Sequence, residues 1–203
     1  MPRLASALRF AALVAVAALF AALVYRLAQP DRGAALTRAV QTHRAPAVPD
    51  LSFRVVWRDA STWPTAVRSL AQRRTLSIAD LHGYPVVVNF WSSWCDACKR
   101  EASLLAAAAA ARRGEVVFLG VDVNDHSGDA RRFLGRHRVP YVAVRSGSVA
   151  IERFGLIALP ETFYVDRTGR IRNVTRGQLS APTLERGLGS MRRVPAPRRP
   201  ARA

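Results

Sequence analysis

Cysteine is nearly absent from this chain of 203 residues, which contains only Cys95 and Cys98. A small secreted domain stapled by disulfides needs more cysteines at wider spacings, so an ordinary hydrophobic core must hold this fold together. Half of the residues are hydrophobic, and the length suits one medium-sized globular domain with extensions. This composition excludes general disorder.

Lysine is almost as scarce, because Lys99 is the only lysine among the 31 basic residues. The formal net charge of +17 is therefore carried by arginine, a bias that indicates a GC-rich genome more than a binding face. No basic stripe interleaved with aromatic side chains accompanies the charge, so we expect no nucleic-acid partner. Attraction to anionic lipid head groups agrees better with it.

Metal ligands are also few. A zinc site needs four ligands, but there is no second cysteine pair and the histidines lack a paired spacing. The histidines are His43, His82, His126 and His137. We therefore expect a redox-active cysteine pair with no metal and no cofactor. The alternatives for the two cysteines are half of a zinc site and two inert thiols in the core.

One long apolar run, over residues 10–25, indicates a membrane-targeting segment. A helix that starts at Leu4, with Arg9 snorkelling, would reach about 33 Å, enough for a hydrocarbon core of ~30 Å. A cleaved signal peptide is the alternative, although the small-x-small triplet at residues 15–17 lies inside the run. We expect an uncleaved single-pass anchor over residues 1–28.

Three further regions follow the expected anchor. Residues 29–50 carry three prolines and no apolar periodicity, which predicts a linker. Residues 51–188 hold the patterned, domain-forming part of the chain. Residues 189–203 are proline-rich and basic without an apolar face, which predicts a disordered tail.

Strand-like and helix-like segments alternate within the domain. The pattern predicts strands at 51–57, 85–91, 115–123, 141–145, 161–166 and 170–175, and helices at 96–113, 128–138, 149–154 and from 181 onward. Buried strands joined by a helix argue for a right-handed βαβ unit, and the turn at Thr168-Gly169 adds an antiparallel hairpin. The expected fold class is an α/β three-layer α/β/α sandwich with a mixed central sheet.

The two cysteines lie between a predicted buried strand and a predicted helix, in the sequence VVVNFWSSWCDAC. A helix N-terminus presents unpaired N–H groups and partial positive charge, which stabilise a thiolate at Cys95. Two intervening residues bring the sulfur of Cys98 within disulfide distance. Cys95 is therefore the expected nucleophile, and Cys98 the thiol that resolves a mixed disulfide.

The segment NFWSSWCDACKRE resembles the active-site segment of the thioredoxin superfamily, particularly its membrane-tethered TlpA/ResA/CcmG branch. FGLIALPETFYVDRTGRI resembles the stretch around the cis-proline of that branch. TLSIADLHGYPVVVNFW and GVDVNDHSGDARRFL are similar to its entry segment and to its extra strand and helix. The resemblance covers roughly residues 48–188 and implies a thioredoxin-like fold.

The resemblance also implies roles for individual residues. Cys95 would be the exposed nucleophile, Cys98 its buried partner and Trp94 the neighbouring aromatic. Pro160 would be the cis-proline that faces the pair, and Leu159 would offer its backbone to a substrate peptide. A trans proline that opens a strand is the alternative for Pro160.

Glu101 is the third expected catalytic residue. It follows Cys98 by three residues, so both share a helix face and its carboxylate can accept the proton when Cys98 attacks. Burial would raise its pKa toward a useful value. A solvated carboxylate near Lys99 and Arg100 is the alternative. Asn89 stands where thioredoxin has an aspartate.

Two departures from the family pattern bear on the direction of the reaction. The dipeptide between the cysteines is Asp96-Ala97, whereas many relatives have proline in the second place. The charge of Asp96 opposes a thiolate at Cys95, which favours a reductant. Ala158 replaces the glycine that is common shortly before the cis-proline.

Taken with the apolar run, the resemblance implies a protein-disulfide reductase in the inner membrane, with its domain facing the periplasm. Its expected partners are exported proteins with disulfides, apocytochrome c among them, a membrane-embedded thiol electron donor and the lipid membrane. An oxidase or isomerase uses the same centre at another potential and stays open. A copper-delivery module also stays open, although resembling families place three residues between the cysteines.

Overall fold

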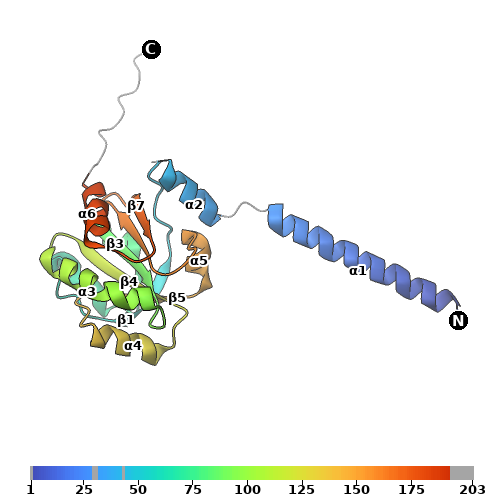
Figure 1. Cartoon of the computed structure of the whole chain (residues 1–203), viewed down its shortest axis with the longest axis horizontal. Helices are drawn as coiled ribbons and strands as arrows, with labels where there is room; N and C mark the ends of the chain where they lie inside the picture. Colours follow the sequence, from blue (N-terminus) through green and yellow to red (C-terminus); the bar gives the residue numbers. More distant parts are fainter. Residues whose placement is uncertain (1, 29–31, 43, 193–203) are drawn as a thin grey trace, which may run out of the picture.

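The computed structural model describes residues 2–28, 32–42 and 44–192 of the chain (Figure 1). Two helices, α1 (Pro2–Ala28) and α2 (Arg32–Gln41), precede the sheet, and α1 lies apart from it. Among the described residues, no helix has the combined length and hydropathy of a membrane span.

Seven strands form one mixed sheet in the order β2-β1-β5-β4-β3-β6-β7. Their bounds are β1 (Ser52–Trp57), β2 (Thr75–Ser77), β3 (Val86–Trp91), β4 (Val117–Val123), β5 (Ala143–Ser146), β6 (Glu161–Val165) and β7 (Ile171–Arg176). β4 is parallel to β3 and to β5, and every other neighbouring pair is antiparallel. The predicted mixed sheet is confirmed.

Helices join these strands. Their bounds are α3 (Asp96–Ala111), α4 (Ser127–Arg136), α5 (Ser148–Phe154) and α6 (Ala181–Ser190), with short 3-10 helices η1 (Thr65–Gln72) and η2 (Ile78–Leu81). Residues of β3, β4 and β6 are all buried, so the centre of the sheet is covered on both faces. The continuous apolar runs in the sequence predicted such strands, and the α/β sandwich agrees with them.

Side chains of β3 alternate between the two covered faces. Phe90 packs against Phe154 of α5 and Phe163 of β6, with ring centroids 4.8 and 5.5 Å apart. On the opposite face, Trp91 stacks on Phe133 of α4 at 4.4 Å. Both layers therefore fix the end of β3, from which the chain enters the segment that carries the cysteines.

The expected linker at residues 29–50 differs from the structure. It contains α2, which lies beside α5 and β7 (Figure 1). Leu36 and Val40 of α2 are half-buried against the core, because a spacing of four residues places both on one face. Ala47 then forms an isolated antiparallel bridge with Arg170.

The C-terminal boundary also lies slightly later than the sequence indicates. α6 continues to Ser190, and Met191 is buried against the core. One methionine at the end of a segment does not produce a recognisable apolar pattern in the sequence. Met191 is buried because it contacts the core. Most of the expected tail, residues 193–203, lies outside the described residues.

Candidate redox site at the start of helix α3

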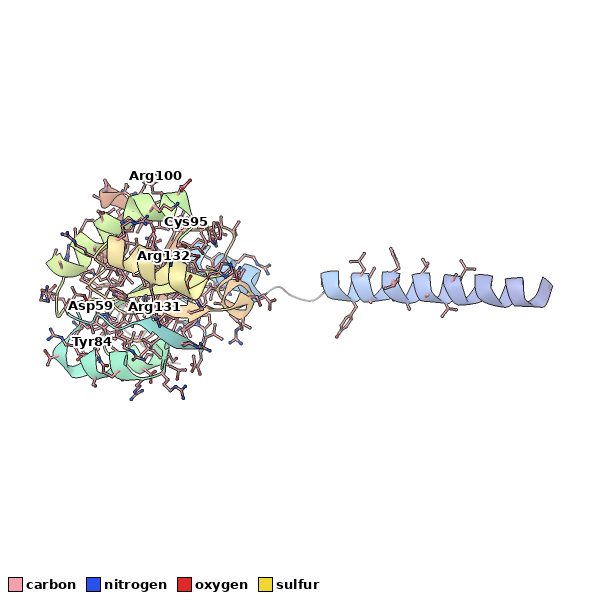
Figure 2. The ribbon with its side chains drawn as sticks, turned by 90° about the horizontal axis from the view of Figure 1, so that it is seen from below. Asp59, Tyr84, Cys95, Arg100, Arg131 and Arg132 are labelled. Atoms are coloured by element: carbon pink, nitrogen blue, oxygen red, sulfur yellow. A yellow bond between two sulfur atoms is a disulfide. The ribbon has the colours of Figure 1, made fainter. Side chains whose placement is uncertain are left out.

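Cys95 and Cys98 form a disulfide, with their Cα atoms 5.2 Å apart. Cys95 is the N-cap residue of α3, and its Sγ accepts a hydrogen bond from the backbone N–H of Cys98 at 3.1 Å. Figure 2 places Cys95 beside the beginning of α3, away from Asp59 and Tyr84. The sulfur of Cys95 thus lies where the helix presents its unpaired N–H groups, as the sequence predicts.

The local backbone explains this placement. The N–H of Cys95 donates to the carbonyl of Ser92 at 3.2 Å and closes a turn after β3. The carbonyl of Cys95 accepts the first helical bond, from the N–H of Lys99 at 3.1 Å. Cys95 retains 7% exposure against 2% for Cys98, so the first sulfur is the more accessible one.

A groove of about 190 Å³ has Trp94, the residue directly before Cys95, in its lining. Apolar side chains of three separate segments line it, together with one polar residue: Trp94, Val123, Asn124, Ile151, Leu156, Ile157, Ala158 and Leu159. Trp94 is 61% exposed and Ile157 is 77% exposed. The structure thus brings Trp94 and Leu159 to one groove, which can hold an extended apolar peptide segment.

Pro160 follows this groove and is buried. The peptide bond between Leu159 and Pro160 is cis, as the family resemblance implies. The carbonyl of Pro160 accepts the N–H of Gly177 at 2.9 Å, which ties the start of β6 to the end of β7. Pro160 is therefore fixed within the fold directly after Leu159, the last residue of the groove lining.

Glu101 is buried at 1% exposure, so the solvated alternative for this residue is wrong. Its Oε1 accepts a hydrogen bond from Asn89 Nδ2 at 2.9 Å, and its Oε2 accepts one from the N–H of Leu179 at 2.6 Å. Asn89 also donates to Thr162 Oγ1 at 3.0 Å. Burial raises the pKa of Glu101 to about 7, although both hydrogen bonds lower it.

A small cavity is lined by both Cys98 and Asn89, the residue that donates to Glu101. It measures about 10 Å³, and its lining includes Asn89, Trp91, Cys98 and Tyr141. Burial raises the pKa of Tyr141 well above its usual range, and the charge of Glu101 adds to the rise. A carboxyl group with a pKa near neutrality, one helical turn from Cys98, can take up the proton of that thiol.

Charged side chains around the cysteines are paired at the surface. Lys99 Nζ contacts Asp96 Oδ1 at 2.7 Å, and this pairing lowers the pKa of Asp96. Arg100 Nε donates to Gln178 Oε1 at 2.7 Å. Lys99 and Arg100 therefore each have another polar partner, and neither interacts with the sulfur of Cys95 alone.

Two acidic residues at the site escaped the sequence reasoning. Glu161 is buried, and its Oε1 accepts the N–H groups of Ile157 at 2.7 Å and Ala158 at 3.2 Å. Asp125 accepts two hydrogen bonds from Ser93. In the sequence, each of these residues is visible only as an acid inside or beside an apolar strand. That position does not show which groups donate hydrogen bonds to its carboxylate.

Comparisons with known proteins agree with a redox-active cysteine pair. The model of the AhpC/TSA family matches residues 62–174. The thiol:disulfide interchange protein DsbE homolog of Paracoccus denitrificans is 40% identical over 96 residues, which cover 46% of this chain and 51% of that protein. This chain therefore spans about half the length of that relative.

A second curated relative is matched over more of its length. The thiol:disulfide interchange protein DsbE of Pseudomonas aeruginosa is 31% identical over 137 residues, covering 60% of this chain and 73% of that protein. Among solved structures, a secreted Mycobacterium tuberculosis disulfide oxidoreductase superposes with a TM-score of 0.56 at 19% identity. That match covers 69% of this chain and 95% of the other, and it supports the thioredoxin-like fold.

The raised pKa of Glu101 predicts a pH-dependent stability. The folded protein keeps a proton up to about pH 7, whereas the unfolded chain releases it near 4.5. The free energy of unfolding therefore falls as the pH rises through this window, by about 3 kcal/mol in all and about 1 kcal/mol between pH 6 and 8. Chemical denaturation of the oxidised protein at a series of pH values measures this fall in the free energy of unfolding. Glu101→Gln is expected to abolish the part of the fall that occurs near pH 7 and above.

Asp122, whose pKa burial raises to about 6, contributes to the slope mainly below pH 7, so the range from pH 7 to 8 reports chiefly on Glu101. Glu152→Gln, at an exposed position of α5, is the matched control and should keep the wild-type slope. An unchanged slope in Glu101→Gln would show that another group carries the titration.

Proposed function

Because this chain belongs to the AhpC/TSA family, we propose that it is a thiol:disulfide oxidoreductase in which Cys95 and Cys98 carry the exchange. The observation that carries the proposal is a disulfide at the N-terminus of α3, directly after a residue that lines an open apolar groove. The names of the DsbE relatives support the same chemistry.

The exchange has two steps. In the reduced protein, the thiolate of Cys95 attacks one sulfur of the client disulfide, and the other client sulfur leaves as a thiolate. Cys98 then attacks Cys95 in the mixed disulfide, which forms the Cys95–Cys98 disulfide and releases the client as a dithiol. Two electrons pass to the client, and the protein ends in the oxidised form described above.

Glu101 supports the second step. Cys98 must lose its proton before it attacks, and it is almost completely buried, so solvent is a poor acceptor. Glu101 follows it by one helical turn, and its pKa of about 7 suits proton transfer near neutral pH. We assign Glu101 as the proton acceptor and Trp94, Leu159 and Pro160 as the residues that receive the client.

The direction of the reaction follows from charge. Asp96 lies between the cysteines, is exposed, and keeps its negative charge because Lys99 lowers its pKa. No cationic side chain stands in the dipeptide to stabilise a thiolate strongly, so the dithiol gives up electrons readily. We therefore favour a reductant over an oxidase or isomerase.

The proposed clients are exported proteins that carry disulfides. Apocytochrome c is a suitable example, because its CxxCH thiols must be reduced before haem attachment. A membrane-embedded thiol donor would return electrons to the Cys95–Cys98 disulfide. The apolar groove supports this choice, since it offers contact area and no strong charge for an extended peptide.

We also propose that the N-terminal segment anchors the domain to the inner membrane, on its periplasmic side. Large apolar side chains of α1 are exposed, among them Leu13, Leu19 and Phe20. Such a surface needs an apolar environment, and a redox-active disulfide persists outside the cytoplasm.

Protease treatment of intact spheroplasts tests this location. The domain is expected to be cut together with a periplasmic control protein, because both are accessible from outside. A domain that stays intact while the control is cut would place it in the cytoplasm.

The roles of the two cysteines predict different trapping behaviour. With an oxidised CxxCH peptide, reduced Cys98→Ala should accumulate a mixed disulfide, because Cys95, the less buried of the two cysteines, attacks and no resolving thiol remains. Cys95→Ala should form little adduct, since Cys98 is buried. Mass spectrometry after acid quenching measures both, and equal adducts would exclude the assigned roles.

The reduction potential tests the direction. We expect a value nearer thioredoxin's, about −270 mV, than the value of a strong oxidant, about −120 mV. The purified full-length protein is equilibrated in glutathione or dithiothreitol buffers, and alkylation reports the reduced fraction. A potential above about −180 mV would favour the isomerase or oxidase function instead.

A further inference from the structure

The segment between β3 and Cys95 is attached to the far end of β4 by side chains. Ser92 Oγ donates to the carbonyl of Val123. The N–H of Ser93 donates to Asp125 Oδ2 at 2.6 Å, and Ser93 Oγ donates to Asp125 Oδ1 at 2.7 Å. Both oxygens of Asp125 therefore bind one residue, which stands two positions before the nucleophile.

These two hydrogen bonds join two segments that line the groove. Trp94 directly follows Ser93, Asn124 directly precedes Asp125, and both belong to the lining. Asn124 has a φ of 57°, so the backbone turns sharply as it leaves β4. A change at Asp125 would alter the groove width and the position of Cys95 together.

An ion pair lies near the end of β4, three residues before Asp125. Asp122 of β4 is completely buried, and its Oδ2 lies 2.8 Å from Arg145 Nη2 of β5. Its Oδ1 is buried without a hydrogen-bond partner among the described residues. Burial raises the pKa of Asp122 to about 6, and the nearby Asp125 carboxyl adds to the rise. Asp122 and Arg145 therefore hold the end of β4, from which the chain continues to Asp125.

We propose that Asp125 is a positioning residue for thiol–disulfide exchange: it holds Ser93, and through it Trp94 and Cys95, against the Asn124 side of the groove. The inference rests on the proposed function, because it assigns the groove to a client peptide. It adds a group that touches neither the client nor the sulfur atoms.

A purely structural role would slow every reaction of Cys95 equally or only lower stability. A positioning role affects a peptide, which must occupy the groove, more than a small disulfide, which needs only the sulfur. The test compares the rates at which the reduced full-length Cys98→Ala protein forms mixed disulfides with an oxidised CxxCH peptide and with hydroxyethyl disulfide.

Asp125→Ala in this background is expected to slow the peptide reaction about tenfold or more, since small displacements of reacting groups cost this much. The reaction with hydroxyethyl disulfide should change less than about threefold. Asp129→Ala is the matched control, because Asp129 is an acid of the adjoining helix that pairs with Arg132. It should leave both rates near those of the parent protein.

Two further changes keep the proposal testable if Asp125→Ala does not fold. Ser93→Ala should reproduce part of the selective loss, because it removes the hydroxyl that donates to Asp125 Oδ1. Asp125→Asn should recover part of the peptide rate, since its amide oxygen can still accept one hydrogen bond from Ser93. Equal slowing of both reactions, or no slowing, in the folded variants would overturn the proposal. A parent protein that reacts with hydroxyethyl disulfide but never with the peptide would instead contradict the proposed function.

Discussion

The buried carboxyl group of Glu101 is the constraint around which the redox site is arranged. An acid in an apolar interior costs free energy unless its oxygens are bonded, and here Asn89 of β3 and the backbone of Leu179 supply those bonds. Asn89 reaches on to Thr162 of β6, so the carboxyl connects the central sheet, α3 and the approach to α6. The residue that would take the proton of Cys98 therefore also fixes where the helix sits on the sheet.

Features that depend on local pattern were predictable. The continuous apolar runs of β3 and β4 predicted strands covered on both faces, and the cysteine spacing predicted a pair at a helix start. The i, i+3 relation placed Glu101 on the face of Cys98, and burial follows because that face meets the sheet. The helix α2 was missed because Leu36 and Val40 alone give too short an apolar stripe, and only contact with α5 and β7 makes them part of the core.

Contacts between distant polar groups were beyond the sequence. Asp125 meets Ser93 across 32 positions, and Asp122 meets Arg145 across 23, because parallel strands bring them to the same edge of the sheet. Glu161 follows the proline of a recognisable motif, yet its bonds to Ile157 and Ala158 depend on how the chain folds back before β6. The residue type shows that a buried acid needs hydrogen-bond or ion-pair partners. Which partners it has depends on how the strands are aligned in the folded sheet.

The docking of α2 against α5 and β7 changes the reach of the thioredoxin-like domain. A fully extended segment from residue 29 to 50 would allow the domain to swing about 75 Å from the end of α1, but α2 removes most of that length. Only three residues separate Ala28 from Arg32, a span of about 15 Å when extended. With α1 in the proposed membrane anchor, a connection of this length would keep the thiols in a thin layer next to the membrane. It would raise the local concentration of partners in that layer and exclude those farther away.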